Sequence, residues 1–264
     1  MKDVLNLREV MSFEVDENGL PTLCQKNFAI IDLLISNDSN YRKSDNRDEN
    51  YEMILSEGIP TKSEDIKKVV KLIDKQNSTH LSSEGQKYKG ASNGREITAK
   101  KIQKLIESGE LEKSLKNGDV EIIHKIANAV NEFHEEENNV LGSKYNFSFA
   151  TKFCAYTSIF ALEMDNYCIY DNVVSKVLPY YAKKYIDKKC WKNRNGKITS
   201  EFINRKGKED YINYRQVIDE ILASAKAKHG NEISYKEFDN LLWYYFKGEP
   251  SRLNKAYEAL NKLK

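Results

Sequence analysis

The chain has 264 residues, of which 40% are hydrophobic and 31% charged, and its formal net charge is +2. This length supports one large domain or two lobes with a real core. The near-neutral charge excludes a globally basic nucleic-acid binder, so basic residues would have to gather on one face. The cysteines, at positions 24, 154, 168 and 190, show no CxxC spacing, which favours a reduced cytoplasmic protein without a zinc cluster. The longest apolar run, 28–35, is short and contains an aspartate, so we expect neither a membrane span nor a signal peptide.

The N-terminal part of the chain carries the weakest structural signals. Residues 18–21 (Asn-Gly-Leu-Pro) are typical of a turn, the run 28–36 fits either a buried strand or a helix, and 37–50 is a polar loop. Ser63 can cap a helix whose apolar positions recur at helical spacing. The Ser-, Gly-, Asn- and Lys-rich stretch 77–94 predicts a long loop at a lobe boundary. The apolar positions of the helix after Ser63 are Ile66, Val69, Val70, Leu72 and Ile73.

The rest of the chain has helical periodicity, so we predict a mainly α protein with minor β content allowed only near the N-terminus. One predicted helix, 119–137, places Val120, Ile123, Ala127 and Val130 on one face. The other predicted helices are 95–108, 149–163, 171–187, 208–228, 234–247 and 249–263.

Lys152 and Asp171, nineteen residues apart, are the candidate catalytic residues. Each opens a helical apolar run. The positive end of a helix dipole favours the neutral, nucleophilic form of an amine held in the first turns. A nearby carboxylate can handle protons or stabilise a developing positive charge. This pair of groups suits attack on a sugar carbon through a Schiff base.

Each residue also has an ordinary structural interpretation. A lysine near a helix start is usually a solvated surface residue, and an aspartate before an apolar helix is usually an N-cap. A helix from Lys152 to about residue 163 is roughly 18 Å long. The residues 164–171 span at most about 28 Å when extended. The chain can therefore bring Asp171 back to Lys152, although nothing in the spacing requires it.

The segment 146–178 resembles the helix-hairpin-helix DNA glycosylases, and most closely their 8-oxoguanine DNA glycosylase branch. The motif Phe147-Ser-Phe-Ala-Thr-Lys matches the family's hairpin and its nucleophilic lysine. The motif Ile169-Tyr-Asp-Asn-Val matches the family's segment that carries the catalytic aspartate. These two motifs and a later one, Phe238-Asp-Asn-Leu-Leu-Trp, are also similar to motifs in a group of bacterial proteins with this fold, many of which are found near antiphage defence genes. The resemblance says little about residues 1–110. We therefore divide the chain into 1–110, an N-terminal region of uncertain fold that is helical from about 63 with a loop at 77–95, and 111–264, a glycosylase-like helical domain.

The resemblance implies a function and a site. Lys152 would be the nucleophile that expels the base and forms a Schiff base, which can lead on to β-elimination, and Asp171 would stabilise the oxocarbenium charge and orient or deprotonate the amine. Such enzymes extrude the target nucleotide from the duplex, and the chemistry needs no cofactor. Hairpin residues would contact the DNA backbone, namely Ser148, Phe149, Ala150 and Thr151.

Two departures from the family keep other functions open. Ser148 and Ala150 stand where the family has glycines that allow close approach to a phosphate, and Val173 replaces a histidine. The substrate could thus be duplex DNA, single-stranded DNA or a nucleotide. The alternatives to an enzyme are a non-catalytic nucleotide or nucleic-acid binding module of the same fold, and an accessory subunit that binds a defence protein.

Residues outside the resemblance add candidates for nucleic-acid contact. The basic stretch 188–208 includes Lys192 and Arg194. It can bind the phosphates of a nucleic acid, or it can be a solvated surface loop. Tyr156, one turn after Lys152, can line a base pocket. Trp243 can stack on an extruded base, although core packing explains most aromatic residues around it. Cys154 is expected to be buried, and His134 beside an acidic run is expected to be a solvated helix end, so we predict no metal site.

Overall fold

The structure is a computed structural model that describes residues 12–37, 50–77, 79–81, 94–136, 145–188, 208–247 and 250–263. These residues are mainly α-helical, which confirms the predicted class. Pairing of extended chain within the described residues is limited to one isolated antiparallel bridge between Val15 and Pro21. The chain divides into two compact units, unit 1 and unit 2.

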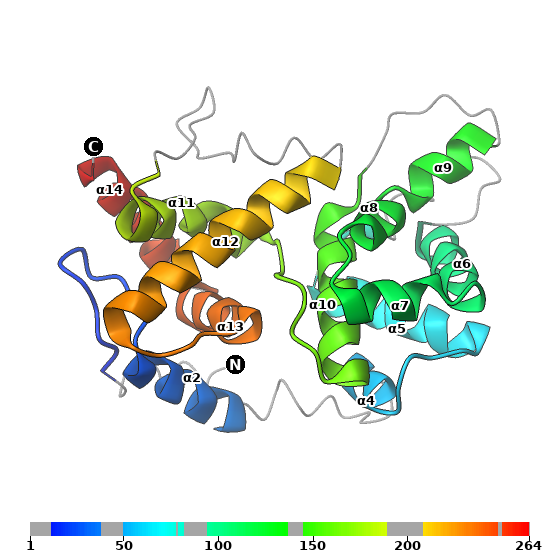
Figure 1. Ribbon diagram of the computed structural model, residues 1–264, viewed down its shortest axis with the longest axis horizontal. Coiled ribbons are helices and arrows are strands. Elements are labelled where there is room, and N and C mark those ends of the chain that lie inside the picture. Colours follow the sequence, from blue (N-terminus) through cyan, green and yellow to red (C-terminus); the bar gives the residue numbers. More distant parts are fainter. Residues whose placement is uncertain are drawn as a thin grey trace. The chain divides into compact units, whose positions relative to one another are not determined.

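Unit 2 takes its described residues from the range 50–169 and from 208–211. Its last helix, α10, is apolar on nearly all sides, as a central helix must be, and it packs against α4, α5, α7 and α8 (Figure 1). The helices of unit 2 are α4 (Tyr51–Ser56), α5 (Ser63–Asn77), α6 (Gly94–Glu107), α7 (Glu110–Asn117), α8 (Glu121–Ala127), α9 (Ala129–Glu136) and α10 (Phe147–Leu162).

Helix α5 follows its sequence pattern closely. It begins at Ser63, and all five apolar positions predicted from its spacing are buried. Helix α6 begins one residue before its predicted start. The buried side chain of Asp74 in α5 accepts hydrogen bonds from Thr79 Oγ1 (2.6 Å), from the Leu81 N–H (2.9 Å) and from Arg95 Nε (2.7 Å). Asp74 thus joins the end of α5 to the start of α6.

The sequence-based prediction was wrong in three places in unit 2, the first of which is the short helix α4, which was not predicted. The predicted helix 119–137 is two helices, α8 and α9, separated at Asn128. Asparagine is a poor helix former, and the side chain of Asn128 accepts a hydrogen bond from Asn131 Nδ2 in the first turn of α9 (2.7 Å). Helix α7 was not predicted. It has only 8 residues and is bounded by Gly109 and Gly118, which both have positive φ.

Unit 1 takes its described residues from 12–37, 170–188, 212–247 and 250–263. The run 28–36, which fitted a strand or a helix, is helical. The helices are α2 (Gln25–Asn37), α11 (Asn172–Ile186), α12 (Lys208–His229, assigned to unit 1 from residue 212), α13 (Tyr235–Phe246) and α14 (Pro250–Lys262). Helix α11 packs against α13 and α14, and α13 packs against α2. The boundary predicted at residue 110 stays a prediction, because it marks where the family resemblance begins.

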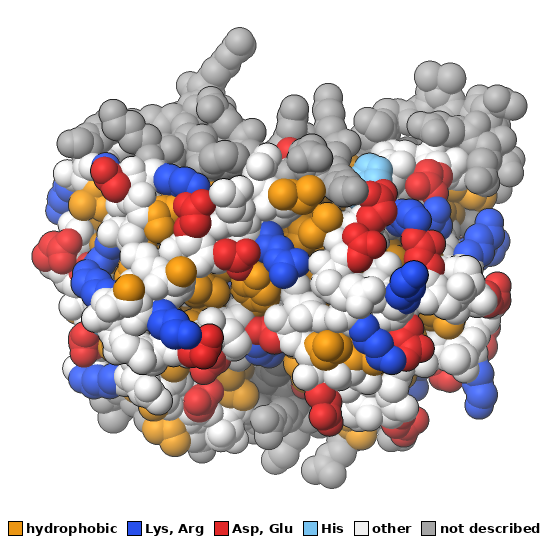
Figure 2. All heavy atoms as spheres, viewed as in Figure 1, with side chains coloured by type: hydrophobic (Ala, Val, Ile, Leu, Met, Phe, Trp, Pro, Cys, Tyr) orange, Lys and Arg blue, Asp and Glu red, His pale blue; other side chains and the backbone are white. Residues whose placement is uncertain are grey.

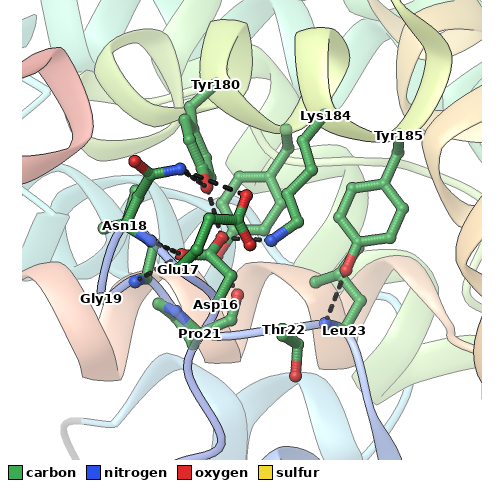
Figure 3. A network of polar contacts seen from close by, with 12 residues as sticks. Asp16, Glu17, Asn18, Gly19, Pro21, Thr22, Leu23, Tyr180, Lys184 and Tyr185 are labelled. Carbon is green, nitrogen blue, oxygen red and sulfur yellow. Dashed lines mark hydrogen bonds and ion pairs between the residues drawn. The ribbon is translucent and has the colours of Figure 1, made fainter. Parts of the chain in front are cut away.

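The predicted turn at residues 18–21 is part of a polar network in unit 1 (Figure 3). One carboxylate oxygen of Asp16, Oδ1, accepts the N–H groups of Asn18 (2.9 Å) and Leu20 (3.1 Å). The other, Oδ2, accepts from the Tyr180 hydroxyl and the Lys184 amine, both on α11. Burial acts to raise the pKa of Asp16, but the hydrogen bonds from Lys184 and Tyr180 prevail and hold it below 3.8.

Other tyrosines of α11 hold the chain just after this turn. The Tyr181 hydroxyl donates to the Pro21 carbonyl (2.8 Å), and the Tyr185 hydroxyl accepts the N–H of Leu23 (3.0 Å). These bonds satisfy backbone groups that would be costly to bury unpaired. The N-terminal turn is therefore fastened along α11, the helix that begins next to Asp171.

Candidate functional site

Helix α10 contains the residues that the sequence matched to the hairpin. Its N-cap, Asn146, makes no side-chain capping hydrogen bond, and the Asn146 N–H donates to the carbonyl of Ala127 at the end of α8 (2.9 Å). Ser148 is half-buried, whereas Phe149, Ala150 and Thr151 are at most 1% exposed. The Ala150 N–H, expected to face a phosphate, donates to the Asn146 carbonyl (3.0 Å). Of these residues, Ser148 is therefore the most accessible.

Lys152 is a buried residue, only 5% exposed. Its amine donates a hydrogen bond to the Ser148 hydroxyl, with Nζ and Oγ 3.3 Å apart. The two side chains are neighbours because residues four apart lie on the same face of a helix. The interpretation of Lys152 as a solvated surface lysine is therefore wrong. Burying an amine carries a desolvation penalty. The role of Lys152 is therefore not that of a surface charge that keeps the protein in solution.

Tyr156, predicted to line a base pocket, follows Lys152 by one turn and is 4% exposed. Its ring stacks on Tyr51 of α4, with centroids 4.9 Å apart. Its hydroxyl donates to Asn77 Oδ1 at the end of α5 (3.3 Å). Sequence reasoning missed Tyr51 and Asn77, because no local pattern connects them with α10. One face of the Tyr156 ring is occupied by Tyr51 in this structure.

The chain after α10 is fixed within unit 2 as far as residue 169. The helix ends at Glu163, which has the left-handed conformation (φ 56°). Asn166 Nδ2 then donates to the carbonyl of Leu115 (2.9 Å), and the Tyr167 hydroxyl donates to the carbonyl of Ser114 (2.7 Å). The N–H of Cys168 donates to the Tyr211 hydroxyl (3.0 Å). The segment between α10 and Asp171 is therefore anchored to the carbonyls of Ser114 and Leu115 and to the Tyr211 hydroxyl.

Asp171 begins α11 and is 8% exposed. Its Oδ1 atom accepts the N–H groups of Val173 (2.8 Å) and Val174 (2.9 Å), so Asp171 is the N-cap of this helix. The structural interpretation of Asp171 as an N-cap is thus confirmed. Lys152 belongs to unit 2 and Asp171 to unit 1, so the pairing of their side chains stays a prediction.

Trp243, the second predicted base-pocket residue, lies in α13 of unit 1 and is half-buried. The Lys247 amine lies over its ring, 5.6 Å from the centroid. Its neighbours Leu242 and Tyr244 are buried, which supports the expectation that most of this aromatic cluster packs in the core.

Of the remaining predicted residues, the structure describes Cys154 but not Lys192 and Arg194. Cys154 is fully buried, as expected, and burial raises the pKa of its thiol. Lys192 and Arg194 lie outside the described residues. Within the part of the chain that is described, no group of three or more His, Cys, Asp and Glu side chains is arranged to hold a metal ion.

The visible charged surface is mixed. In Figure 2, Lys and Arg side chains alternate with Asp and Glu side chains over the face shown, and the described residues of that face form no patch of one sign. None of the described helices is long and apolar enough to cross a membrane.

Comparison with known proteins gives one partial match. Residues 30–160 are similar to the family HI_0787_N, described as an N-terminal domain. The match covers just under half of the chain. It includes most of unit 2 with Lys152 and ends before Asp171. No curated protein and no solved structure matches the chain.

Proposed function

We propose that this protein is a DNA N-glycosylase with an associated β-lyase step, which removes a modified or damaged base through a Schiff base on Lys152. The observation that carries the proposal is the buried amine of Lys152 near the start of α10. Lysine is among the residues that are most rarely buried. Partial desolvation and a nearby helix N-terminus both favour the neutral, nucleophilic form of an amine. The resemblance to helix-hairpin-helix glycosylases places the nucleophile at this residue.

The proposed reaction assigns each of the two residues one role. The Lys152 nitrogen bonds to the sugar C1′ as the bond from C1′ to the base breaks, and the base leaves with the electron pair. Asp171 stabilises the positive charge that develops on the sugar and then takes a proton from the attacking amine. The nitrogen lone pair then forms the C=N bond of the Schiff base as the C1′–O4′ bond breaks, and O4′ leaves with the electron pair and takes back the proton from Asp171. A setting in bacterial antiphage defence, with DNA or a nucleotide as substrate, rests on the resemblance.

Borohydride trapping on DNA oligomers that carry modified bases or abasic sites tests this proposal directly. Wild-type protein should form a covalent adduct with at least one oligomer, and Lys152→Gln should form none. Lys71→Gln is the matched control, because Lys71 is an exposed lysine on α5 of the same unit. An adduct that survives in Lys152→Gln, or one that both variants lose, would contradict the assignment of the nucleophile.

One observation favours a second function, a non-catalytic nucleotide or nucleic-acid binding module. Ser148 and Ala150 replace the hairpin glycines, and the Ala150 N–H is engaged within the helix. Wild-type protein that binds the oligomers without forming an adduct on any of them would support this module. In that case Lys152→Gln should change the affinity for the oligomers, and neither wild type nor the variant should form an adduct.

A further inference from the structure

We propose that the Ser148 hydroxyl is a positioning group for the Lys152 amine, an inference that rests on the proposed function. Ser148 was expected to contact a DNA phosphate through its backbone, in place of a glycine. The structure instead directs its side chain to the amine, one helical turn away, at 3.3 Å. A glycine at this position has no side chain and could not make this bond.

The surroundings of the two residues restrict the amine. Lys152 is 5% exposed, and its sequence neighbours Thr151 and Phe153 are buried as well. Most residues of α10 around Lys152 are buried. Ser148, in contrast, is half-buried at the start of the helix. The bond to Ser148 therefore holds the amine toward the accessible end of α10.

A hydroxyl suits this task in both protonation states of the lysine. An ammonium group has three N–H donors, and a serine oxygen has two lone pairs that accept them. After loss of one proton, the neutral amine still has two N–H groups. One of them can remain bonded to Ser148 while the nitrogen lone pair, which lies along a different direction, is available for attack on C1′. An aligned nucleophile gains rate because its orientation is fixed before the reaction.

An isosteric pair of variants isolates the hydroxyl. Threonine at position 148 retains a hydroxyl, whereas valine has the same shape without one. With the DNA that wild type traps, we expect Ser148→Val to lower the pH-independent rate constant of adduct formation, reached where the amine is neutral in both proteins, by about tenfold at saturating DNA. Ser148→Thr should stay within about threefold of wild type. The dissociation constant for DNA and the melting temperature should change little in either variant.

A second measurement needs no DNA. The rate of acetylation of Lys152 by acetic anhydride, followed by mass spectrometry across pH, reports how its amine titrates in the free protein. A hydrogen bond to the ammonium form favours that form. The midpoint of the labelling profile should therefore lie at lower pH in Ser148→Val than in Ser148→Thr and wild type.

The two measurements separate failure of the inference from failure of the proposed function. Equal trapping rates for valine, threonine and wild type would overturn the positioning role while leaving the enzyme intact. Weaker DNA binding with an unchanged saturating rate would assign Ser148 to phosphate contact instead. If wild type traps no DNA, the proposed function fails, and the labelling profile alone decides. Identical midpoints in all three proteins would then overturn the inference, and a shift confined to valine would support it.

Discussion

Asp16 and Asp171 are two aspartates of unit 1 that organise the backbone in the same way; the side chain of Asp16 is 2% exposed, and Asp171 as a whole is 8% exposed. In each, Oδ1 accepts two N–H groups from residues that follow shortly after it: Asn18 and Leu20 for Asp16, and Val173 and Val174 for Asp171. Each carboxylate thereby sets the direction of the chain. They differ in their second oxygen and in the task we assign to it.

The second oxygen of Asp16 has a structural task. It accepts hydrogen bonds from Tyr180 and Lys184, whose side chain is 10% exposed. A buried carboxylate with so many donors is held in one protonation state and one position. For Asp171, the proposed function directs the second oxygen to the reacting amine and sugar. Both aspartates accept their backbone N–H groups through Oδ1, so capping alone does not decide between a structural and a catalytic role.

The largest expected effect is that of Asp171→Asn on activity. Asparagine is as good an N-cap as aspartate, so α11 should remain intact, but it has no charge and cannot take a proton. The rate of adduct formation should fall by about 100- to 1,000-fold, with the unfolding free energy reduced by at most about 1 kcal/mol. Trapping kinetics and urea unfolding measure the two effects. Full activity in Asp171→Asn would leave Asp171 with its capping role only.

The same substitution at Asp16 should affect stability instead. In Asp16→Asn, the new amide would turn an N–H donor toward Lys184 and Tyr180 and leave the lysine charge without its partner, at a cost of about 3 kcal/mol in unfolding free energy. Asp187→Asn is the control, because Asp187 pairs with Lys183 on the same helix but its side chain is 85% exposed. That variant should cost less than about 1 kcal/mol. Equal costs in the two variants would show that burial of the Asp16 pair contributes nothing.

The Asp16 pair also predicts a dependence of stability on pH. Because the pKa of Asp16 is lower in the folded protein than its ordinary value of 3.8, its contribution is complete above that value and is lost as the pH falls through the folded pKa. The difference in unfolding free energy between wild type and Asp16→Asn should therefore be constant from pH 7 to about pH 5 and shrink below about pH 4. A difference that is the same at pH 3 and pH 7 would contradict this assignment.

The sequence predicted the long helices well, because their apolar positions repeat every three to four residues over several turns. Helices α6, α10, α11, α12, α13 and α14 begin and end within about two residues of the predicted bounds, a shift that is usual at helix ends. The short helices α4 and α7 and the break at Asn128 were missed, since none of them extends over enough turns to show a period. The Asp16 network could not be predicted, because it joins the N-terminal turn to Tyr180 and Lys184, more than 160 residues later.

The candidate site was predictable to a similar extent. The chemical types and positions of Lys152 and Asp171 follow from the sequence, and so does the cap at Asp171. The burial of Lys152 does not, because a lysine near a helix start is more often exposed. The contacts of Tyr156 with Tyr51 and Asn77 come from α4 and α5, which pack on α10 only after the chain folds.

The smallest expected effect is the loss of a helix cap, and its cost at Ser234 gives a reference value for the cap at Asp171. Helix α13 begins with a capping box, in which Ser234 Oγ accepts the Glu237 N–H (3.1 Å) and the Glu237 carboxylate accepts the Ser234 N–H (2.8 Å). Ser234→Ala should cost about 1 kcal/mol in unfolding free energy, and Ser234→Thr should cost less. Asp171→Ala should then cost a similar amount, about 0.5–2 kcal/mol, if the cap is its whole contribution to folding. A cost for Asp171→Ala that greatly exceeds that of Ser234→Ala would mean that the second oxygen of Asp171 also stabilises the fold, as that of Asp16 does, and would weaken its assignment to chemistry.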